Sequence, residues 1–130
     1  MSHQSPAKIL VVDDETDFLF YICKILKQAG YHVLIAENGE QAWQLFQAEQ
    51  PQLVLTDLVM PEKSGYELAR LIRGSPHPET PIISLTGFPF RDDMTRGDSK
   101  LVDLYLTKPI QNADLLTAIG ICLDKMFISP

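Results

Sequence analysis

Short apolar runs and longer helix-like segments alternate along the chain. The runs are rich in valine, isoleucine and leucine and cover residues 8–13, 32–36, 53–57, 81–86 and 104–107. Each has the length of a strand, and the apolar residues follow one another instead of occupying every second position. Continuous apolar strands are typical of a parallel sheet covered on both faces. We therefore predict five strands in one parallel sheet.

The segments between these runs carry apolar residues at helical spacing. The clearest stripe lies in the first segment and consists of Phe18, Leu19, Ile22, Ile25, Leu26 and Ala29. A second clear stripe lies near the end of the chain and consists of Leu115, Leu116, Ile119, Cys122, Leu123 and Met126. Gly30 follows the first stripe, where glycine commonly ends a helix. Both stripes predict amphipathic helices.

Capping residues mark the limits of the later helices. Asn38 is predicted to cap the second helix, Ser64 to open the third and Asn112 to cap the last. Pro51 follows the second helix and Gly74 closes the third. Each boundary therefore has a residue whose chemistry suits it.

The segment from 88 to 101 fits a helix poorly because it contains Pro89, Gly97 and a polar middle. We expect the fourth helix to be short, mobile or irregular. The alternation of strands and helices predicts a (βα)5 architecture, a flavodoxin-like, doubly wound parallel α/β sheet with helices on both faces. We expect a single domain over residues 1–130, with an ordered core over roughly 7–127.

Polar side chains stand at the ends of four of the five predicted strands. Asp13 and Asp14 end the first, Asp57 ends the third, Thr86 ends the fourth, and the fifth runs into Lys108. In an open parallel sheet these ends share one edge, where ligands bind. Three carboxylates gathered there repel one another unless a cation lies among them. No histidine or cysteine stands at these ends, so a hard ion that prefers oxygen ligands, Mg²⁺, is the predicted cofactor.

A carboxylate beside a metal, a lysine and a hydroxyl suits phosphoryl chemistry. An aspartate is able to act as nucleophile and become an acyl phosphate, while positive charges neutralise the transferring group. Pro61 and Gly65 turn the chain away after Asp57 and keep its side chain accessible.

Composition and charge narrow the classes of partner. The 130 residues carry 11 basic against 17 acidic side chains, a net charge of -6. No run of lysine and arginine is present that could neutralise a row of phosphates, so we do not expect direct binding to nucleic acid. No apolar stretch approaches the ~20 residues of a membrane span, and the first residues lack a secretory signal, so we expect a cytoplasmic protein that binds no membrane. Cys23 and Cys122 lie among apolar residues and are interpreted as buried small hydrophobes.

Four segments, "ILVVDDE", "LVLTDLVMPEKSG", "PIISLTG" and "YLTKP", occur in this order along the chain. Together they resemble the receiver domain of bacterial two-component response regulators, over nearly the whole chain. The resemblance implies that Asp57 is the phosphoacceptor. It also implies that Asp13 and Asp14 hold Mg²⁺, with Asp57 and the backbone carbonyl of Val59 as further ligands.

The resemblance further implies a conformational switch. Thr86 hydrogen-bonds the phosphoryl group, Lys108 pairs with it, and rotation of Tyr105 reports the event. Lys108-Pro109 is the cis peptide that the family typically has. A histidine kinase or phosphotransfer protein is the expected donor, and a downstream protein or output domain the expected target.

The partner surface implied by the resemblance is the face made by the fourth helix, the fifth strand and the last helix. A homodimer through this face is one expectation. The domain catalyses only its own phosphorylation and dephosphorylation, so we do not expect an enzyme. Because the chain ends soon after its last predicted helix, we expect a stand-alone receiver or a fragment of a transcription factor or hybrid kinase.

Taken alone, each of these residues also has an ordinary structural role. Asp57 fits a cap or turn residue, Asp14 an N-cap of the first helix, Thr86 a strand-end hydroxyl, and Tyr105 a core aromatic. Their joint occurrence at one predicted edge favours the functional interpretation, and an N-cap role for Asp14 is compatible with metal binding.

Two features depart from the family pattern. Val59 and Phe88 stand two residues after Asp57 and Thr86, and neither side chain is able to orient a hydrolytic water, which predicts a long-lived acyl phosphate. The stretch "GDSKLVDLYLTKP" is more apolar than the family commonly has there, and "GFPF" precedes it. This indicates either an altered fourth helix with an unusual partner or dimer surface, or a shifted loop.

Three rival functions use related chemistry or the same topology. An aspartate-dependent phosphatase of the haloacid dehalogenase type requires a second acid where Val59 stands. A non-phosphorylated interaction module of the same fold does not require the full motif set. A flavodoxin-like cofactor carrier requires a phosphate-binding loop, whereas "DDETD" repels phosphate.

Overall fold

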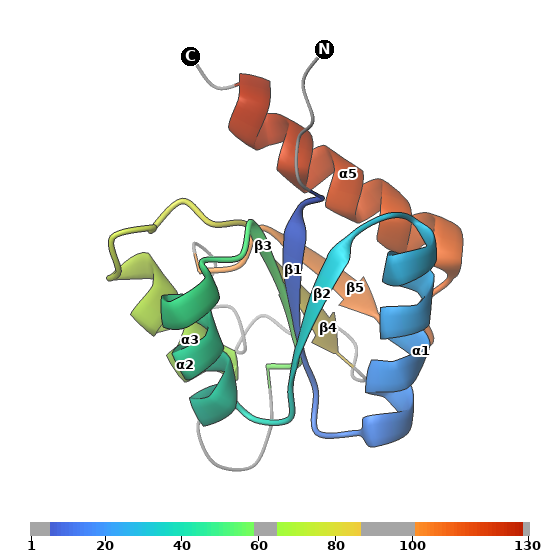
Figure 1. The fold of residues 1–130 in the computed structure, drawn as a ribbon, viewed down its shortest axis with the longest axis horizontal. Helices are drawn as coiled ribbons and strands as arrows, with labels where there is room; N and C mark the ends of the chain where they lie inside the picture. The colour runs from blue at the N-terminus through green and yellow to red at the C-terminus, as the bar shows by residue number, and fades with distance from the viewer. Residues whose placement is uncertain (1–5, 59–64, 87–100, 129–130) are drawn as a thin grey trace.

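The computed structural model describes residues 6–58, 65–86 and 101–128, with Thr86 and residues 125–128 described by their backbone alone. The elements in this part of the chain (Figure 1) are β1 (Lys8–Val12), α1 (Thr16–Gln28), β2 (His32–Ala36), α2 (Gly39–Glu49), β3 (Leu53–Thr56), α3 (Gly65–Arg73), β4 (Ile82–Thr86), β5 (Leu104–Thr107) and α5 (Asn112–Ile128). All five predicted strands are present. The predicted fourth helix falls on residues outside the described ranges.

The five strands form one parallel sheet in the order β2-β1-β3-β4-β5. From β1 the chain first moves outward to β2 and then crosses to the other side of β1 to place β3. The strand order therefore reverses between β1 and β3. In doubly wound sheets the crevice at such a reversal is the usual ligand site. The predicted fold class is confirmed.

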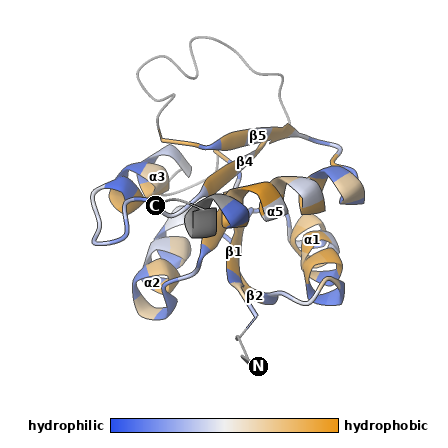
Figure 2. Cartoon of the chain, turned by 90° about the horizontal axis from the view of Figure 1, so that it is seen from above, coloured by the Kyte–Doolittle hydropathy of each residue, from blue (hydrophilic) through white to orange (hydrophobic). Residues whose placement is uncertain are grey.

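Helices cover both faces of the sheet. Figure 2 shows α1 and α5 on one face and α2 and α3 on the other. Successive residues of one strand enter different cores: Ile9 and Val11 pack in the cluster beneath α1 and α5, whereas Leu10 and Val12 pack in the cluster beneath α2 and α3. Because both faces are buried, the strands need apolar residues at every position, which explains the uninterrupted runs.

Of the predicted helix caps, that at Asn38 is confirmed, those at Asp14 and Asn112 are wrong, and Ser64 lies outside the described residues. The Asn38 side chain accepts a hydrogen bond from the Gln41 amide at 2.8 Å at the start of α2. The N-cap of α1 is Glu15, not Asp14, and it makes no side-chain cap bond. Helix α1 thus begins one residue later than a cap at Asp14 implies. In the turn before it, Asp13 Oδ1 accepts a hydrogen bond from the Glu15 amide at 2.9 Å.

The start of α5 also differs from the prediction. The helix begins at Asn112 itself, and the Leu115 amide donates to the Gln111 carbonyl, so Gln111 holds the cap position. The Asn112 side chain is engaged elsewhere: its Oδ1 accepts from the Tyr21 hydroxyl at 2.8 Å. This bond joins α1 to the first turn of α5.

Cys23 and Cys122 are both buried, as predicted, and no disulfide joins them. Burial raises the pKa of the Cys23 thiol, which keeps it protonated and unreactive. None of the described helices is long and apolar enough to cross a membrane.

Candidate functional site

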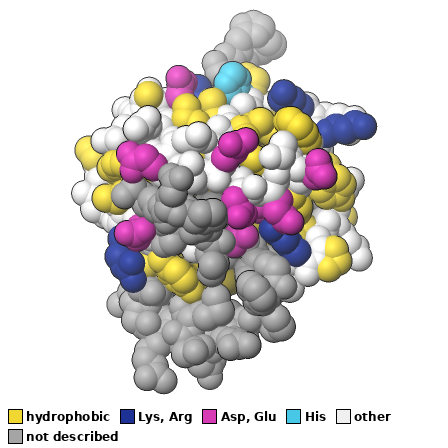
Figure 3. Space-filling view, turned by 90° about the horizontal axis from the view of Figure 1, so that it is seen from below, with side chains coloured by type: hydrophobic (Ala, Val, Ile, Leu, Met, Phe, Trp, Pro, Cys, Tyr) yellow, Lys and Arg dark blue, Asp and Glu magenta, His cyan; other side chains and the backbone are white. Residues whose placement is uncertain are grey.

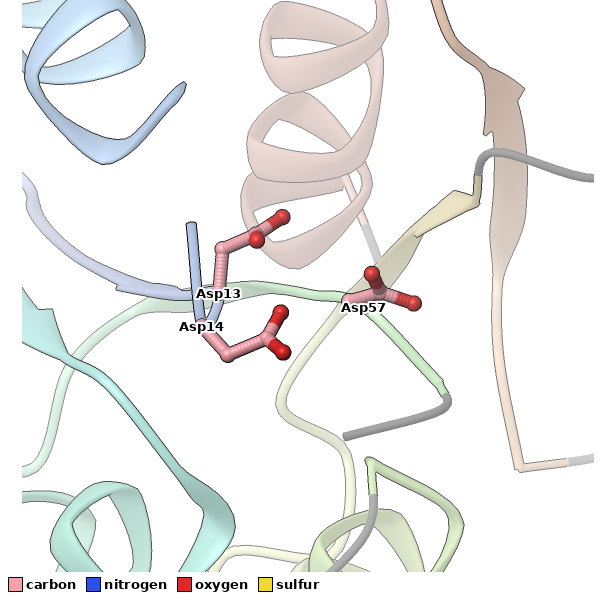
Figure 4. Close-up of side chains that lie close together, drawn as sticks. All are labelled: Asp13, Asp14 and Asp57. Atoms are coloured by element: carbon pink, nitrogen blue, oxygen red, sulfur yellow. The ribbon is translucent and has the colours of Figure 1, made fainter. Parts of the chain in front are cut away.

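Three aspartates converge where the strand order reverses. Asp13 and Asp14 follow β1, and Asp57 follows β3. One carboxylate oxygen from each lies within 4.8 Å of the others. The close-up shows the three side chains projecting from two chain segments into one region (Figure 4). Asp13 is fully buried, Asp57 is half-buried and Asp14 is exposed, so the group opens towards solvent on one side.

Backbone contacts hold these acids in place. The Asp13 amide donates to the Ala36 carbonyl at 3.2 Å, and the Asp57 amide donates to the Val12 carbonyl at 3.1 Å. Both amides thus extend the sheet by one hydrogen bond beyond the strands. Gly65 passes so close that a Cβ there would overlap the Asp57 backbone carbonyl. Glycine at this position therefore lets the chain turn back beside the acid.

Lys108 brings a positive charge into the acidic group. Its Nζ lies 2.8 Å from Asp13 Oδ2, 3.5 Å from Glu15 Oε1 and 3.6 Å from Asp57 Oδ2. The Lys108-Pro109 peptide is cis, as the resemblance implied. Burial by itself lowers the pKa of Lys108, but the hydrogen bond to Asp13 and the nearby carboxylate charges outweigh it, so the pKa lies above its ordinary value of 10.5. The side chain is therefore a permanent cation.

Two residues in this site were missed by sequence reasoning. The ring of Phe18 lies 4.1 Å from Lys108 Nζ, and the Glu15 carboxylate also reaches that ammonium. The sequence pattern placed Phe18 only in the apolar stripe of a helix. Its contact joins residues far apart in the sequence, and the one available signal was an aromatic residue shortly after the acidic pair.

The remaining predicted site residues are placed in part. Thr86 is the last residue of β4, at the same edge of the sheet, and its side chain is not among those described. Val59 lies outside the described residues. Tyr105 lies in β5 opposite Ser84 of β4 and is half-buried against the core cluster beneath α2 and α3. The structure thus brings together Asp13, Asp14, Asp57 and Lys108.

Residues 9–120 match the family model of the response regulator receiver domain. The chain belongs to this family. The family membership confirms the resemblance carried by the four sequence motifs, and it implies phosphorylation-based two-component signalling.

Known receiver proteins agree with this assignment in sequence and in structure. The chain is 36% identical over 122 residues to the response regulator receiver protein CpdR of Brucella abortus, covering 94% of this chain and 98% of CpdR. A receiver domain protein of Clostridium thermocellum superposes with a TM-score of 0.86 at 31% identity, covering 94% of this chain and 98% of that one.

A third similar receiver protein was solved with ligands. TrrA of Thermotoga maritima, in complex with Mg(2+)-BeF, has a TM-score of 0.78 and 33% identity, covering 89% of this chain and 98% of TrrA.

The donor set of this receiver domain fits a hard divalent cation. The three clustered side chains offer only carboxylate oxygens, the ligand type that Mg²⁺ prefers. Acidic side chains gather beside a basic one on the face at the carboxyl ends of the strands (Figure 3). One lysine against three clustered acids leaves an excess of negative charge, which a cation would compensate.

Proposed function

We propose that this receiver domain is a phosphorylation-dependent signalling switch. Asp57 accepts a phosphoryl group from a histidine kinase or phosphotransfer protein with Mg²⁺ present, and the phosphorylated domain binds its partner differently. The observation that carries the proposal is the acidic rim: three carboxylates within 4.8 Å of one another, and an ammonium 3.6 Å from that of Asp57. Membership of the receiver family supports it.

Asp57 is the acid best placed to be the nucleophile. Its side chain is 17% exposed, so a donor is able to approach it, whereas Asp13 is fully buried and accepts the short bond from Lys108. A carboxylate oxygen of Asp57 attacks phosphorus. The new P–O bond forms as the bond from phosphorus to the donor's imidazole nitrogen breaks, and its electron pair stays on that nitrogen. The product is an acyl phosphate.

Lys108 and Mg²⁺ neutralise the phosphoryl charge in this proposal. The ammonium is fixed within reach of Asp57 before the donor arrives, so little reorganisation is needed. When bound, Mg²⁺ supplies further positive charge to the phosphoryl oxygens. Its proposed ligands are Asp13, Asp14, Asp57 and the backbone carbonyl of Val59. Because the domain acts on its own aspartate, we propose that it is not an enzyme.

The proposed response to phosphorylation involves residues of β4 and β5, on the other side of β3 from β1. We propose that the new phosphoryl oxygens draw Thr86 inward and that Tyr105 moves into the space it leaves. The face that includes β5 and α5 then binds a downstream protein, an output domain or a second copy of the chain. We expect the protein to act in the cytoplasm.

The direct test is intact mass spectrometry after incubation with acetyl phosphate. With Mg²⁺ present, the protein is expected to gain the mass of one phosphoryl group, and excess EDTA is expected to prevent the gain. A protein that binds its partner but never gains this mass would be the non-phosphorylated interaction module. Catalytic turnover of many equivalents of a phosphate monoester would instead indicate the aspartate-dependent phosphatase.

The acyl phosphate is expected to be long-lived, because Val59 and Phe88 offer no polar group to orient an attacking water. The double change Val59→Asn with Phe88→Glu is expected to raise the dephosphorylation rate at least about tenfold, less than the ~10²-fold that a well-positioned acid or base typically contributes. The rate is measured as loss of the phosphoryl mass after the donor is removed. An unchanged rate would show that these two side chains do not set the lifetime.

A further inference from the structure

We infer that Phe18 is a positioning residue that holds the Lys108 ammonium beside Asp57 through a cation–π contact. The inference rests on the proposed function and adds a residue to its machinery. The ring centroid of Phe18 lies 4.1 Å from Lys108 Nζ, well inside the ~6 Å range of such contacts.

The carboxylates around Lys108 hold it unevenly. Asp13 Oδ2 lies at hydrogen-bond distance, 2.8 Å, whereas Asp57 Oδ2 lies at 3.6 Å, beyond it. An ammonium has three N–H donors on a flexible stem, so contacts to acids alone do not fix one orientation. The face of an aromatic ring attracts the cation without taking a lone-pair hydrogen bond. Two of the three donors face Asp13 and Glu15. Phe18 stabilises the ammonium without engaging the third donor, which stays available for a phosphoryl oxygen.

The position of the ring is itself fixed. Phe18 lies in the first turn of α1, half-buried against the core beneath α1 and α5, and its ring centroid lies 6.4 Å from that of Tyr21. The Tyr21 hydroxyl donates to Asn112 Oδ1 at 2.8 Å, at the start of α5. Asn112 is only four residues beyond Lys108. The helix carrying the ring is thus tied to the segment carrying the lysine, so the contact is preorganised.

The kinetic test compares phosphorylation by acetyl phosphate in matched variants. Phe18→Leu keeps an apolar side chain but removes the aromatic face, and is expected to lower the rate about fivefold. Phe18→Tyr keeps the face and is expected to retain the rate within about twofold. Phe20→Leu is the matched control, because Phe20 is 63% exposed on the same helix; it is expected to leave the rate unchanged.

A second kinetic comparison shows whether Phe18 acts through the lysine. In a Lys108→Ala background, Phe18→Leu is expected to cause no further loss, because the cation is already gone. An equal fivefold loss in both backgrounds, or an unchanged rate for Phe18→Leu alone, would overturn the inference.

An NMR measurement tests the contact without phosphorylation. In metal-free wild-type protein, the ring current of Phe18 is expected to shift the Lys108 ε-methylene proton resonances upfield, and Phe18→Leu is expected to remove this shift while Phe20→Leu leaves it. Absence of the shift in the wild type would refute the contact. If the wild type shows the shift but is never phosphorylated, the proposed function fails while the contact stands, so the two failures are distinguishable.

Discussion

Replacing Asp57 by asparagine is expected to abolish the gain of a phosphoryl group, a fall in rate of at least about a thousandfold. An amide is not a competent nucleophile towards phosphorus and brings no negative charge to the site. The neighbouring acids are not expected to act as the nucleophile in its place. Asp13 is fully buried, and among the described ion pairs Lys108 contacts Asp57, at 3.6 Å, but not Asp14. Intact mass after incubation with acetyl phosphate and Mg²⁺ measures the effect.

The matched control for this variant is Asp17→Asn. Asp17 is an exposed acid in the first turn of α1 and is not a member of the cluster of three. The Asp17→Asn variant is expected to gain the phosphoryl group at the wild-type rate. A full phosphoryl gain in Asp57→Asn would place the acceptor on another residue and refute the assignment. Because asparagine is close in shape to aspartate, thermal unfolding is expected to confirm that both variants remain folded.

Replacing Arg73 by alanine is expected to lower the free energy of unfolding by about 3 kcal/mol. Arg73 ends α3, and its guanidinium donates to the carbonyls of Pro78 and Thr80, each at 2.7 Å, and to that of Leu101 at 2.8 and 3.2 Å. A further bond of 2.9 Å reaches Asp103 Oδ2. Removing the guanidinium leaves the two partly buried carbonyls of Thr80 and Leu101 without this donor.

The contacts of Arg73 join three separate segments. Asp103 exchanges hydrogen bonds with the backbone of Ile82 in β4, both at 2.8 Å, so the guanidinium links α3, the loop before β4 and the segment that leads into β5. The ion pair with Asp103 contributes little, because that carboxylate is 41% exposed and solvent screens it. The expected loss comes mainly from the carbonyl bonds, which are stronger when the donor is charged.

Urea unfolding monitored by circular dichroism measures this effect. Arg73→Lys is expected to recover only part of the loss, because an ammonium does not reproduce the planar fork of five donors. Arg70→Ala, at an exposed position on the same helix, is expected to cost less than about 1 kcal/mol. Equal destabilisation by Arg73→Ala and Arg70→Ala would contradict the stabilising role given to the Arg73 hydrogen bonds.

The sequence predicted the fold well because its signals are local or periodic. The uninterrupted apolar run over β1 indicated a strand buried on both faces, and Asn38 indicated the start of α2 through a bond to an amide three residues away. The convergence of Asp13, Asp14 and Asp57 was also predictable, since parallel strands bring their carboxyl ends to one edge.

Other features escaped prediction because they depend on the path of a turn or join distant residues. Asp14 has the side-chain type of an N-cap, but the turn after β1 places Glu15 there and directs Asp13 to the Glu15 amide. Asn112 also has a capping side chain, but Tyr21 of a neighbouring helix engages it instead. In each case a tertiary contact or the path of a turn decided which of several possible partners the side chain met.

The amino-acid sequence by itself determined the order of strands and helices, the parallel sheet and the edge at which the acids meet. Only the tertiary structure decided which side chain holds the lysine and which arginine joins the segments around β4 and β5: Phe18 contacts Lys108 across 90 positions, and Arg73 contacts Leu101 across 28. The physical reason is range. Hydrophobic periodicity and capping act within a few residues, whereas cation–π contacts and multiple hydrogen bonds depend on where whole elements pack.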